Sequence, residues 1–411
     1  MGKSKIGSSI LSELHPTSWA VPLERPLSTK REKKVLRIGI PLENSPFENR
    51  VALTPESVGV LVANGHEVFV QKGAGEASSF PDGAYNAAGA ILCYSLGDIY
   101  IKSDIIVKIS PLSSEELEML RPHQTLVSAV NLGSMTAEHI RTMVRKNILA
   151  IGFEFLQGSD GDLPLVQSLS EIAGVTSIHI ASELLSAHLG GKGLLLGGIT
   201  GVPPAVVTII GAGTVGLGAA RTALGMGASV RVIDEEVNQL RKLSESLGNK
   251  VHTAISMHNY IEDAVLTSDV VIGAAFKPGY RAPIVVTDNM VQEMREGSVI
   301  VDVAIDQGGC VETSYATTHK RPSYIEHDVV HYCVPNIASR VPATASAAVS
   351  NILGPLLIKA GDMGGMESLM KIDQGVKHGV YIYRKHLTKR SLSTIFGLEF
   401  MDINLLVAST L

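Results

Sequence analysis

The chain has only three cysteines among its 411 residues, Cys93, Cys310 and Cys333. They are odd in number and form no C-x-x-C motif, so we expect reduced thiols and a cytoplasmic protein rather than a disulfide framework. No pair of His, Cys, Asp or Glu residues has the spacing of metal ligands. The sequence therefore predicts no metal site.

The chain also lacks an excess of positive charge and a long unbroken apolar run. Its formal net charge is −5 and its pI is near 6.2, so no nucleic acid is expected as a partner. The longest apolar stretch, Leu194–Ala212, is broken by glycines and by Pro203-Pro204, which argues against a membrane span. Residues 1–34 lack the apolar core of a signal peptide. We interpret them as an N-terminal extension, either a mobile arm or a strap over a neighbouring subunit.

What the chain does contain is a glycine-rich turn between two apolar runs. Residues 206–234 read VVTIIGAGTVGLGAARTALGMGASVRVID, which is a strand, G-x-G-x-x-G, a helix, a second strand and an acid. Gly211 permits a tight turn, Gly213 lets a pyrophosphate approach a helix N-terminus, and Gly216 lets that helix pack close to a sheet. Asp234 is suited to bind a ribose 2′-hydroxyl and would repel a 2′-phosphate. We therefore predict that the cofactor is NAD(H) rather than NADP(H).

Two series of apolar segments alternate with helical segments along the chain. The predicted strands of the first series are residues 36–41, 66–71, 104–110, 125–130 and 149–156. Those of the second series are residues 206–210, 229–233, 269–274 and 298–303. This alternation is typical of parallel βαβ units. The predicted fold class is α/β, with two Rossmann-like, doubly wound parallel-sheet domains and a cleft between them.

The two series also divide the chain into parts. These are an N-terminal extension (1–34), the first part of a substrate domain (35–165), an NAD-binding domain (166–342) and C-terminal helices that return to the substrate domain (343–411). Apolar spacing predicts a linking helix from Leu163 to about Leu189, and further helices over 347–360 and 366–387.

Four signatures resemble one known family, the alanine dehydrogenases together with the α subunit of nicotinamide nucleotide transhydrogenase. They are 48–55 (ENRVALTP), 65–68 (GHEV) with 73–76 (GAGE), the glycine turn with Asp234, and 301–310 (VDVAIDQGGC). The resemblance implies an NAD-dependent oxidoreductase that interconverts L-alanine with pyruvate and ammonia. It also implies a soluble homo-oligomer, often a hexamer, that acts on a small-molecule substrate without a membrane partner.

The same resemblance assigns roles to individual residues. Arg50 matches the arginine that binds the substrate carboxylate, a task suited to a guanidinium with two parallel hydrogen bonds. Asp306 matches the aspartate beside the nicotinamide. The residues that match cofactor contacts are Ser170, Gly211, Gly213, Thr214, Val215, Gly216, Asp234, Ser256, Ala275, Phe276, Val303, Ile305, Asp306, Val334 and Asn336.

Two segments depart from the family pattern. Where the family reads Lys-Val-Lys-Glu-Pro, this chain has Lys108-Ile109-Ser110-Pro111, so Ser110 stands at the substrate lysine. Where the family has Tyr-Leu-His, this chain has Ala129-Val130-Asn131. Asn131 can hydrogen-bond a carbonyl but cannot exchange a proton near neutral pH, unlike the family histidine. Alternation along the predicted strand places Lys108 on the same face as Ser110, so we predict that both contact the substrate.

These departures leave more than one interpretation open. In the first, the chain is an amino-acid dehydrogenase in which Arg50 holds the carboxylate, Asn131 polarises the carbonyl or imine, and Asp306 is the acid/base. Small residues at 110 and 129 would then leave room for an amino acid larger than alanine. In the second, the chain binds NAD(H) without amino-acid turnover. In the third, it is a soluble component similar to the transhydrogenase α subunit that acts with membrane partners, although the chain itself shows no membrane segment.

Overall fold

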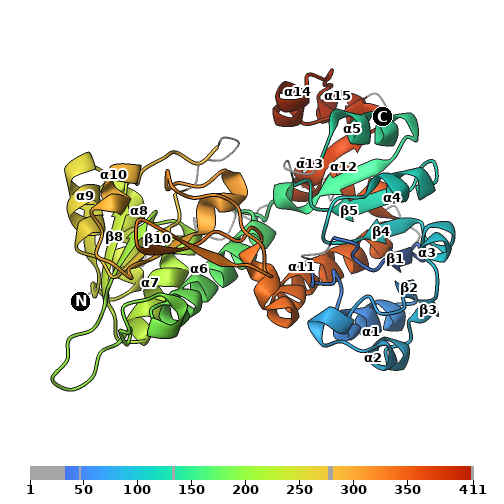
Figure 1. Cartoon of the computed structure of the whole chain (residues 1–411). Helices are drawn as coiled ribbons and strands as arrows, with labels where there is room; N and C mark the ends of the chain where they lie inside the picture. Colours follow the sequence, from blue (N-terminus) through green and yellow to red (C-terminus); the bar gives the residue numbers. More distant parts are fainter. Residues whose placement is uncertain (1–32, 46–47, 132–134, 276–280, 409–411) are drawn as a thin grey trace, which may run out of the picture.

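The computed structural model describes residues 33–45, 48–131, 135–275 and 281–408, whose strands form two sheets in two lobes (Figure 1). Nearly all of the predicted N-terminal extension, residues 1–34, lies outside the described residues. Both sheets are mainly parallel and carry flanking helices, so the predicted two-domain α/β class is confirmed.

Within the described residues, the first sheet has eight strands in the order β15-β14-β6-β5-β4-β1-β2-β3. The parallel strands are β1 (Arg37–Ile40), β2 (Glu67–Gln71), β3 (Ile91–Cys93), β4 (Ile105–Val107), β5 (Thr125–Ser128) and β6 (Leu149–Gly152). The helices between them are α1 (Pro55–Ala63), α2 (Asp82–Ala87), α3 (Leu96–Lys102), α4 (Ser114–Met119) and α5 (Ala137–Arg145).

The second sheet, counted over the same residues, has seven strands in the order β12-β13-β11-β10-β7-β8-β9. These are β7 (Val206–Ile210), β8 (Ser229–Asp234), β9 (His252–Ile255), β10 (Val270–Gly273), β11 (Val299–Asp302), β12 (Ser323–Glu326) and β13 (Val329–Tyr332). Only β12 is antiparallel to its neighbour. The associated helices are α7 (Thr214–Gly225), α8 (Val237–Ser246), α9 (His258–Leu266) and α10 (Asp288–Gln292).

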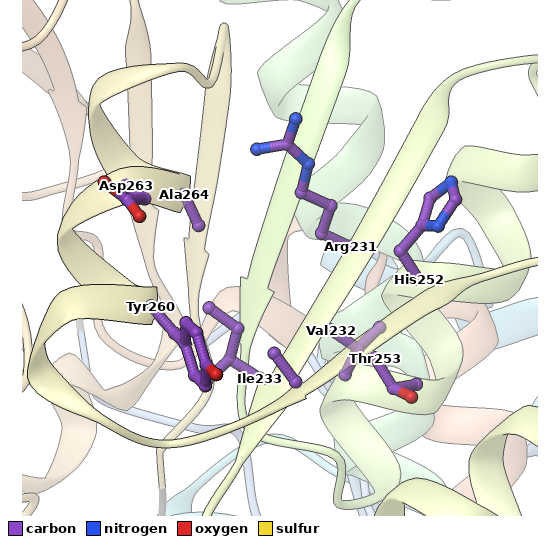
Figure 2. Close-up of a pocket in the computed structure, with 9 residues that line it drawn as sticks. Arg231, Val232, Ile233, His252, Thr253, Tyr260, Asp263 and Ala264 are labelled. Carbon is purple, nitrogen blue, oxygen red and sulfur yellow. The ribbon is translucent and has the colours of Figure 1, made fainter.

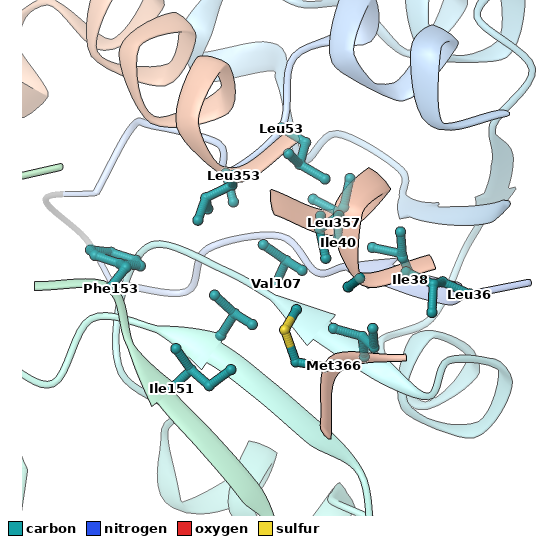
Figure 3. Packing of buried hydrophobic residues seen from close by; sticks show 14 of the residues in the cluster. Leu36, Ile38, Ile40, Leu53, Val107, Ile151, Phe153, Leu353, Leu357 and Met366 are labelled. Atoms are coloured by element: carbon teal, nitrogen blue, oxygen red, sulfur yellow. The ribbon is translucent and has the colours of Figure 1, made fainter. Parts of the chain in front are cut away.

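Two long helices lie between the lobes (Figure 1). The predicted linking helix is α6 (Pro164–Leu184), followed by a 3₁₀ turn over Ala187–Leu189. The return helix is α11 (Pro342–Asp362), which also contacts α6. By length and composition α11 could span a membrane. Its apolar side chains, however, pack with β1, β4 and β6 in the first core, as the labelled Leu353 and Leu357 show in Figure 3.

The prediction of one helix over residues 366–387 is wrong. The segment forms α12 (Met366–Ile372), α13 (Gln374–Gly379), β14 (Val380–Tyr383) and β15 (His386–Leu387), followed by α14 (Arg390–Phe396) and α15 (Ile403–Ala408). β14 lies antiparallel to β6 and β15 antiparallel to β14, so the sheet is mixed rather than wholly parallel. The reversal occurs at Arg384 and Lys385, whose φ angles are 48° and 63°. Such a turn fits a tight hairpin.

Close packing of α6 on α7 depends on Gly174. A Cβ atom on Gly174 of α6 would lie 2.2 Å from the Val215 carbonyl oxygen and 2.8 Å from the Ala219 nitrogen, both backbone atoms of α7. The helix that carries the glycine turn is thereby held against the link between the lobes.

We expect Gly174→Ala to lower the free energy of unfolding by roughly 1–3 kcal/mol, because overpacking forces the two backbones apart. Urea denaturation would measure the change. The matched control is Gly225→Ala in α7, where a Cβ atom would meet nothing within 4 Å. Equal stabilities of the two variants would contradict this account of the packing.

Candidate functional site

The glycine turn leaves open space in front of the N-terminus of α7. Gly211 has a φ of 115°, and a Cβ atom there would lie 2.4 Å from the Ala274 carbonyl oxygen. A Cβ atom on Gly216 would lie 1.9 Å from the Gly211 carbonyl oxygen, so the helix packs directly on the turn. At Gly213, by contrast, a Cβ atom would meet nothing within 4 Å, and the Gly213 and Thr214 backbone is exposed. Free N–H groups at this helix end suit a pyrophosphate.

Asp234 stands beside this turn at the end of β8. Its carboxylate accepts hydrogen bonds from the Ala212 nitrogen at 2.6 Å and the Glu236 nitrogen at 2.8 Å. Each carboxylate oxygen keeps a lone pair for a further donor. The Asp234 carbonyl oxygen also accepts the Ser256 N–H at 2.9 Å. The two residues predicted near the adenosine ribose are thus adjacent.

The other predicted cofactor residues lie on elements that approach the two lobes' junction. Ala275 follows β10, and Phe276 lies outside the described residues. Ser170 is on α6, which contacts the 3₁₀ turn Val303–Gln307 that carries Val303, Ile305 and Asp306. Val334 and Asn336 lie between β13 and a 3₁₀ turn over Ile337–Arg340 that also contacts α6.

A separate hollow lies along the second sheet and is distinct from this arrangement. It is lined by residues of β8, β9 and α9, among them Arg231, His252, Tyr260 and Asp263 (Figure 2). None of the predicted site residues lines it. Across the described residues, no group of three or more His, Cys, Asp or Glu side chains is placed to hold a metal ion.

Arg50 belongs to a segment that α11 and the turn before it hold in place. Backbone N–H groups of this segment donate to serine hydroxyl groups at 2.9–3.1 Å: Asn49 to Ser339, Val51 to Ser346 and Thr54 to Ser350. The serine hydroxyl groups thus accept hydrogen bonds from backbone N–H groups that have no partner within a strand or helix. They also fix the substrate-side segment to the chain that returns from the second sheet.

The Arg50 side chain is buried against Glu48, a residue that sequence reasoning missed. Arg50 Nε donates to Glu48 Oε1 at 2.7 Å, and Arg50 Nη2 donates to Glu48 Oε2 at 2.6 Å. Only 8% of the Arg50 side chain and 4% of the Glu48 side chain are exposed. The pair uses one edge of the guanidinium. The other edge, with N–H groups of Nη1 and Nη2, has the fork geometry that binds a carboxylate.

Asp306 lies at the carboxyl end of β11, on the other side of the site. Its Oδ1 accepts the Asn336 N–H at 2.8 Å. Water reaches the carboxylate, yet protein surrounds it on most sides, and this desolvation raises the pKa of Asp306. The bond from Asn336 and the charge of Arg50 oppose the rise without cancelling it. Asp306 is thus an acid whose pKa is shifted toward neutral pH and depends on the charge of Arg50.

Asn131 follows β5 in a conformation that the half-buried Glu154 supports. Its φ is 32°, in the positive range that few residues other than glycine adopt. The Glu154 carboxylate accepts the Val130 N–H at 2.8 Å and the Asn131 N–H at 3.4 Å. Burial raises the pKa of Glu154, and Arg50 lies near enough to oppose that rise. Glu154 closely follows β6, and acids at the carboxyl ends of parallel strands are a signal that could have identified it.

Lys108 is not available to a substrate, contrary to our expectation. Its side chain is fully buried, and its Nζ lies 2.7 and 2.9 Å from the two oxygens of Glu116 and 3.6 Å from Glu43. The ammonium therefore donates two hydrogen bonds to Glu116 and lies within ion-pair distance of Glu43. β4 ends at Val107, so strand alternation does not extend to Ser110.

Glu43 stabilises the backbone just after β4, where the chain leaves the strand. Its carboxylate accepts the backbone N–H groups of Ile109 and Ser110. Burial raises the pKa of Glu43 to about 7, while Lys108 opposes the rise. Ser110 therefore lies next to the Glu43 carboxylate. Lys108, by contrast, has a structural role.

Comparison with known proteins identifies the family of the chain. The N-terminal domain model of the alanine dehydrogenase/PNT family matches residues 39–173, and the C-terminal domain model matches residues 177–390. An alanine dehydrogenase of Halomonas elongata is 38% identical over 369 residues, covering 89% of this chain and 98% of the relative. That of Mycobacterium tuberculosis is 37% identical over 367 residues, covering 89% and 98%.

Two solved structures extend the comparison to the fold. An L-alanine dehydrogenase superposes with a TM-score of 0.83 at 38% identity, covering 88% of this chain and 99% of that one. A transhydrogenase from Sinorhizobium meliloti superposes with a TM-score of 0.73 at 26% identity, covering 86% and 99%. Because family models match both halves and relatives above 30% identity are covered almost completely, this chain belongs to the alanine dehydrogenase/PNT family.

Proposed function

We propose that this chain is an NAD-dependent amino-acid dehydrogenase that interconverts L-alanine, or a somewhat larger amino acid, with the 2-oxo acid and ammonia. One observation carries the proposal. Arg50, which follows the first strand of one sheet, and Asp306, at the end of a strand of the other, are joined through two residues: Glu48 accepts hydrogen bonds from Arg50 Nη2 and Asn336 Nδ2, and the Asn336 backbone N–H donates to Asp306. A carboxylate-binding group and an acid with a raised pKa therefore flank one site.

The cofactor half of the site would be formed by the second sheet. The backbone of Gly213, Thr214 and Val215 would bind the pyrophosphate, and Asp234 with Ser256 the adenosine ribose. Ser170, Ala275 and the turns that carry Val303, Ile305, Val334 and Asn336 would hold the nicotinamide end. NAD, when bound, supplies the hydride acceptor and donor. We assign this half to residues 166–342, and the substrate half to 35–165 with 343–411.

The substrate half would orient the reacting acid. The free edge of Arg50 binds its carboxylate, which fixes the α-carbon relative to the cofactor. The Asn131 amide, which Glu154 holds through the backbone, donates a hydrogen bond to the carbonyl oxygen or imine. Asp306 accepts the proton that the reaction releases in one direction and donates the proton that it consumes in the other. An acid with a raised pKa exchanges protons closer to neutral pH. Ser110 and Ala129 leave space beside the substrate.

An absorbance assay tests the proposal. Purified protein should consume NADH when given ammonium with pyruvate or with a longer straight-chain 2-oxo acid. The rate should depend on both the oxo acid and ammonium. Two results would contradict a dehydrogenase of this kind. One is NADH consumption that continues when every oxo acid is left out. The other is no NADH consumption with any oxo acid of the series.

The cofactor assignment predicts a preference for NADH over NADPH. We expect Asp234→Ala to weaken NADH binding and to reduce the difference between the two cofactors, because the ribose loses an acceptor and a 2′-phosphate loses its repulsion. Titration by NADH and NADPH fluorescence measures both affinities. Glu235→Ala, at the next residue, is the control for a general loss of negative charge. Equal affinities of the wild-type protein for both cofactors would contradict the assignment.

A second candidate function is cofactor binding without amino-acid turnover, as in a transhydrogenase-like component. The enclosure of Lys108 and the amide at Asn131 favour it, because Lys108 cannot bind a substrate in place of the lost lysine and an amide cannot exchange a proton in place of the lost histidine. In either case we propose a cytoplasmic homo-oligomer, for which the family suggests a hexamer.

A further inference from the structure

Glu48 contacts both the substrate-side arginine and the cofactor-side segment. Its Oε1 accepts the Arg50 backbone N–H at 3.1 Å as well as Arg50 Nε. Its Oε2 accepts Arg50 Nη2 and, at 2.9 Å, the Asn336 Nδ2. The Asn336 backbone nitrogen in turn donates to Asp306 Oδ1. One buried carboxylate thus lies between Arg50 and the residue that holds Asp306.

We propose that Glu48 is a positioning residue that makes the binding of a carboxylate by Arg50 depend on the placement of Asn336 and Asp306. The inference rests on the proposed function, because it takes Arg50 as the carboxylate-binding group. It adds a route by which the cofactor side of the site influences the affinity for the substrate.

The physical basis is the rigidity of this contact. A guanidinium is planar, so the two bonds to Glu48 also set the direction of its free edge. Asn336 has a φ of 58° and a ψ of 47°, a left-handed backbone that directs its amide toward Glu48. A displacement of the segment around Asn336 would break a hydrogen bond to a buried charge. The neighbouring bond from the Asn49 nitrogen to the Ser339 hydroxyl crosses the same junction.

Three variants test this arrangement: Glu48→Gln, Asn336→Gly and the double variant. In Glu48→Gln, the side-chain NH₂ would face donors on Arg50 or Asn336, so at least one bond is lost. Asn336→Gly removes the bridging amide, permits the same left-handed backbone and leaves the Arg50–Glu48 pair in place. Its NADH affinity, measured in parallel, shows whether a cofactor contact of Asn336 is lost as well. Glu171→Gln, which breaks an exposed pair with Arg221, is the control.

Pyruvate and 2-oxobutyrate would be titrated into full-length, NADH-loaded protein, with NADH fluorescence as the readout, and KM and kcat would be measured in parallel. We expect Glu48→Gln to weaken oxo-acid binding about ten- to a hundredfold. KM should rise more than kcat falls. Asn336→Gly should also weaken it. The double variant should bind within about twofold of Glu48→Gln, because either orientation of the glutamine amide breaks the bidentate bond to Arg50, so that Asn336 no longer influences the direction of the guanidinium.

Two results would overturn the inference. One is a pair of independent losses that multiply in the double variant. The other is wild-type affinity in Asn336→Gly. A wild-type protein that binds oxo acids without turning them over would contradict the proposed function alone, and the comparison of variants would still decide the role of Glu48. A wild type that binds no oxo acid would overturn the inference together with the role of Arg50.

Discussion

Asp306→Asn is expected to lower kcat by roughly 10²- to 10⁴-fold, the usual contribution of general acid–base catalysis. Asparagine keeps the shape of the side chain and can still accept the Asn336 N–H, but it cannot carry a proton. Desolvation raises the pKa of Asp306, so the native residue can be protonated nearer neutral pH than an ordinary aspartate. NADH affinity should change little, because the pyrophosphate and adenosine contacts lie elsewhere on the second sheet.

Steady-state kinetics with NADH fluorescence titration would separate these effects. Asp263→Asn, at an exposed aspartate of α9, is the control for loss of one negative charge in the same lobe. If turnover by Asp306→Asn equals that of the wild type, another group carries the proton. If NADH affinity falls in parallel with kcat, Asp306 serves cofactor binding rather than chemistry.

The second large effect is a gain of activity. Asn131→His combined with Ser110→Lys and Ala129→Tyr should raise the rate of pyruvate amination by roughly 10²- to 10⁴-fold over a slow wild type. The backbone can accept these changes. Histidine is among the residues that tolerate the positive φ at position 131, and Glu154 would continue to hold the backbone N–H there. A lysine at position 110 would have the Glu43 carboxylate beside it.

The matched control is Asn131→Gln with the same two partner changes, because an amide cannot titrate. The rate of NADH consumption with pyruvate and ammonium is the measurement. Wild-type activity already equal to that of ordinary alanine dehydrogenases would show that Asn131 is not limiting and that Asp306 suffices. A rise that appears equally in the Asn131→Gln control would indicate substrate fit rather than proton transfer.

The parts of the fold that sequence could predict are those set by local chemistry. The turn at Gly211–Gly216 follows from the space each glycine needs, and the strands around it from continuous apolar runs. The strand β14 was missed because its partner, β6, is more than 200 residues away in the sequence. A short apolar segment of this kind fits a helix or a strand until the free edge of the sheet is known.

The site, too, was predicted only in part, because some of its contacts join residues that are far apart in the sequence. Family resemblance assigned roles to Arg50 and Asp306 residue by residue, and these assignments stay predictions. It could not show that Glu48 and Asn336 lie between them, because that contact joins two sheets. Lys108 was misassigned because strand alternation does not reveal Glu116, which lies on the next helix and accepts hydrogen bonds from the Lys108 ammonium. Partners brought together by tertiary structure decide which charged residue is free to act.

The most direct test of the central claim is isotope transfer from ammonium. Purified full-length protein would be incubated with NADH, ¹⁵N-labelled ammonium and a mixture of pyruvate and longer 2-oxo acids, and the products analysed by mass spectrometry. The account predicts at least one amino acid that carries ¹⁵N, formed in amounts equal to the NADH consumed and absent in Arg50→Ala under the same conditions. Binding of NADH without any labelled amino acid would contradict it.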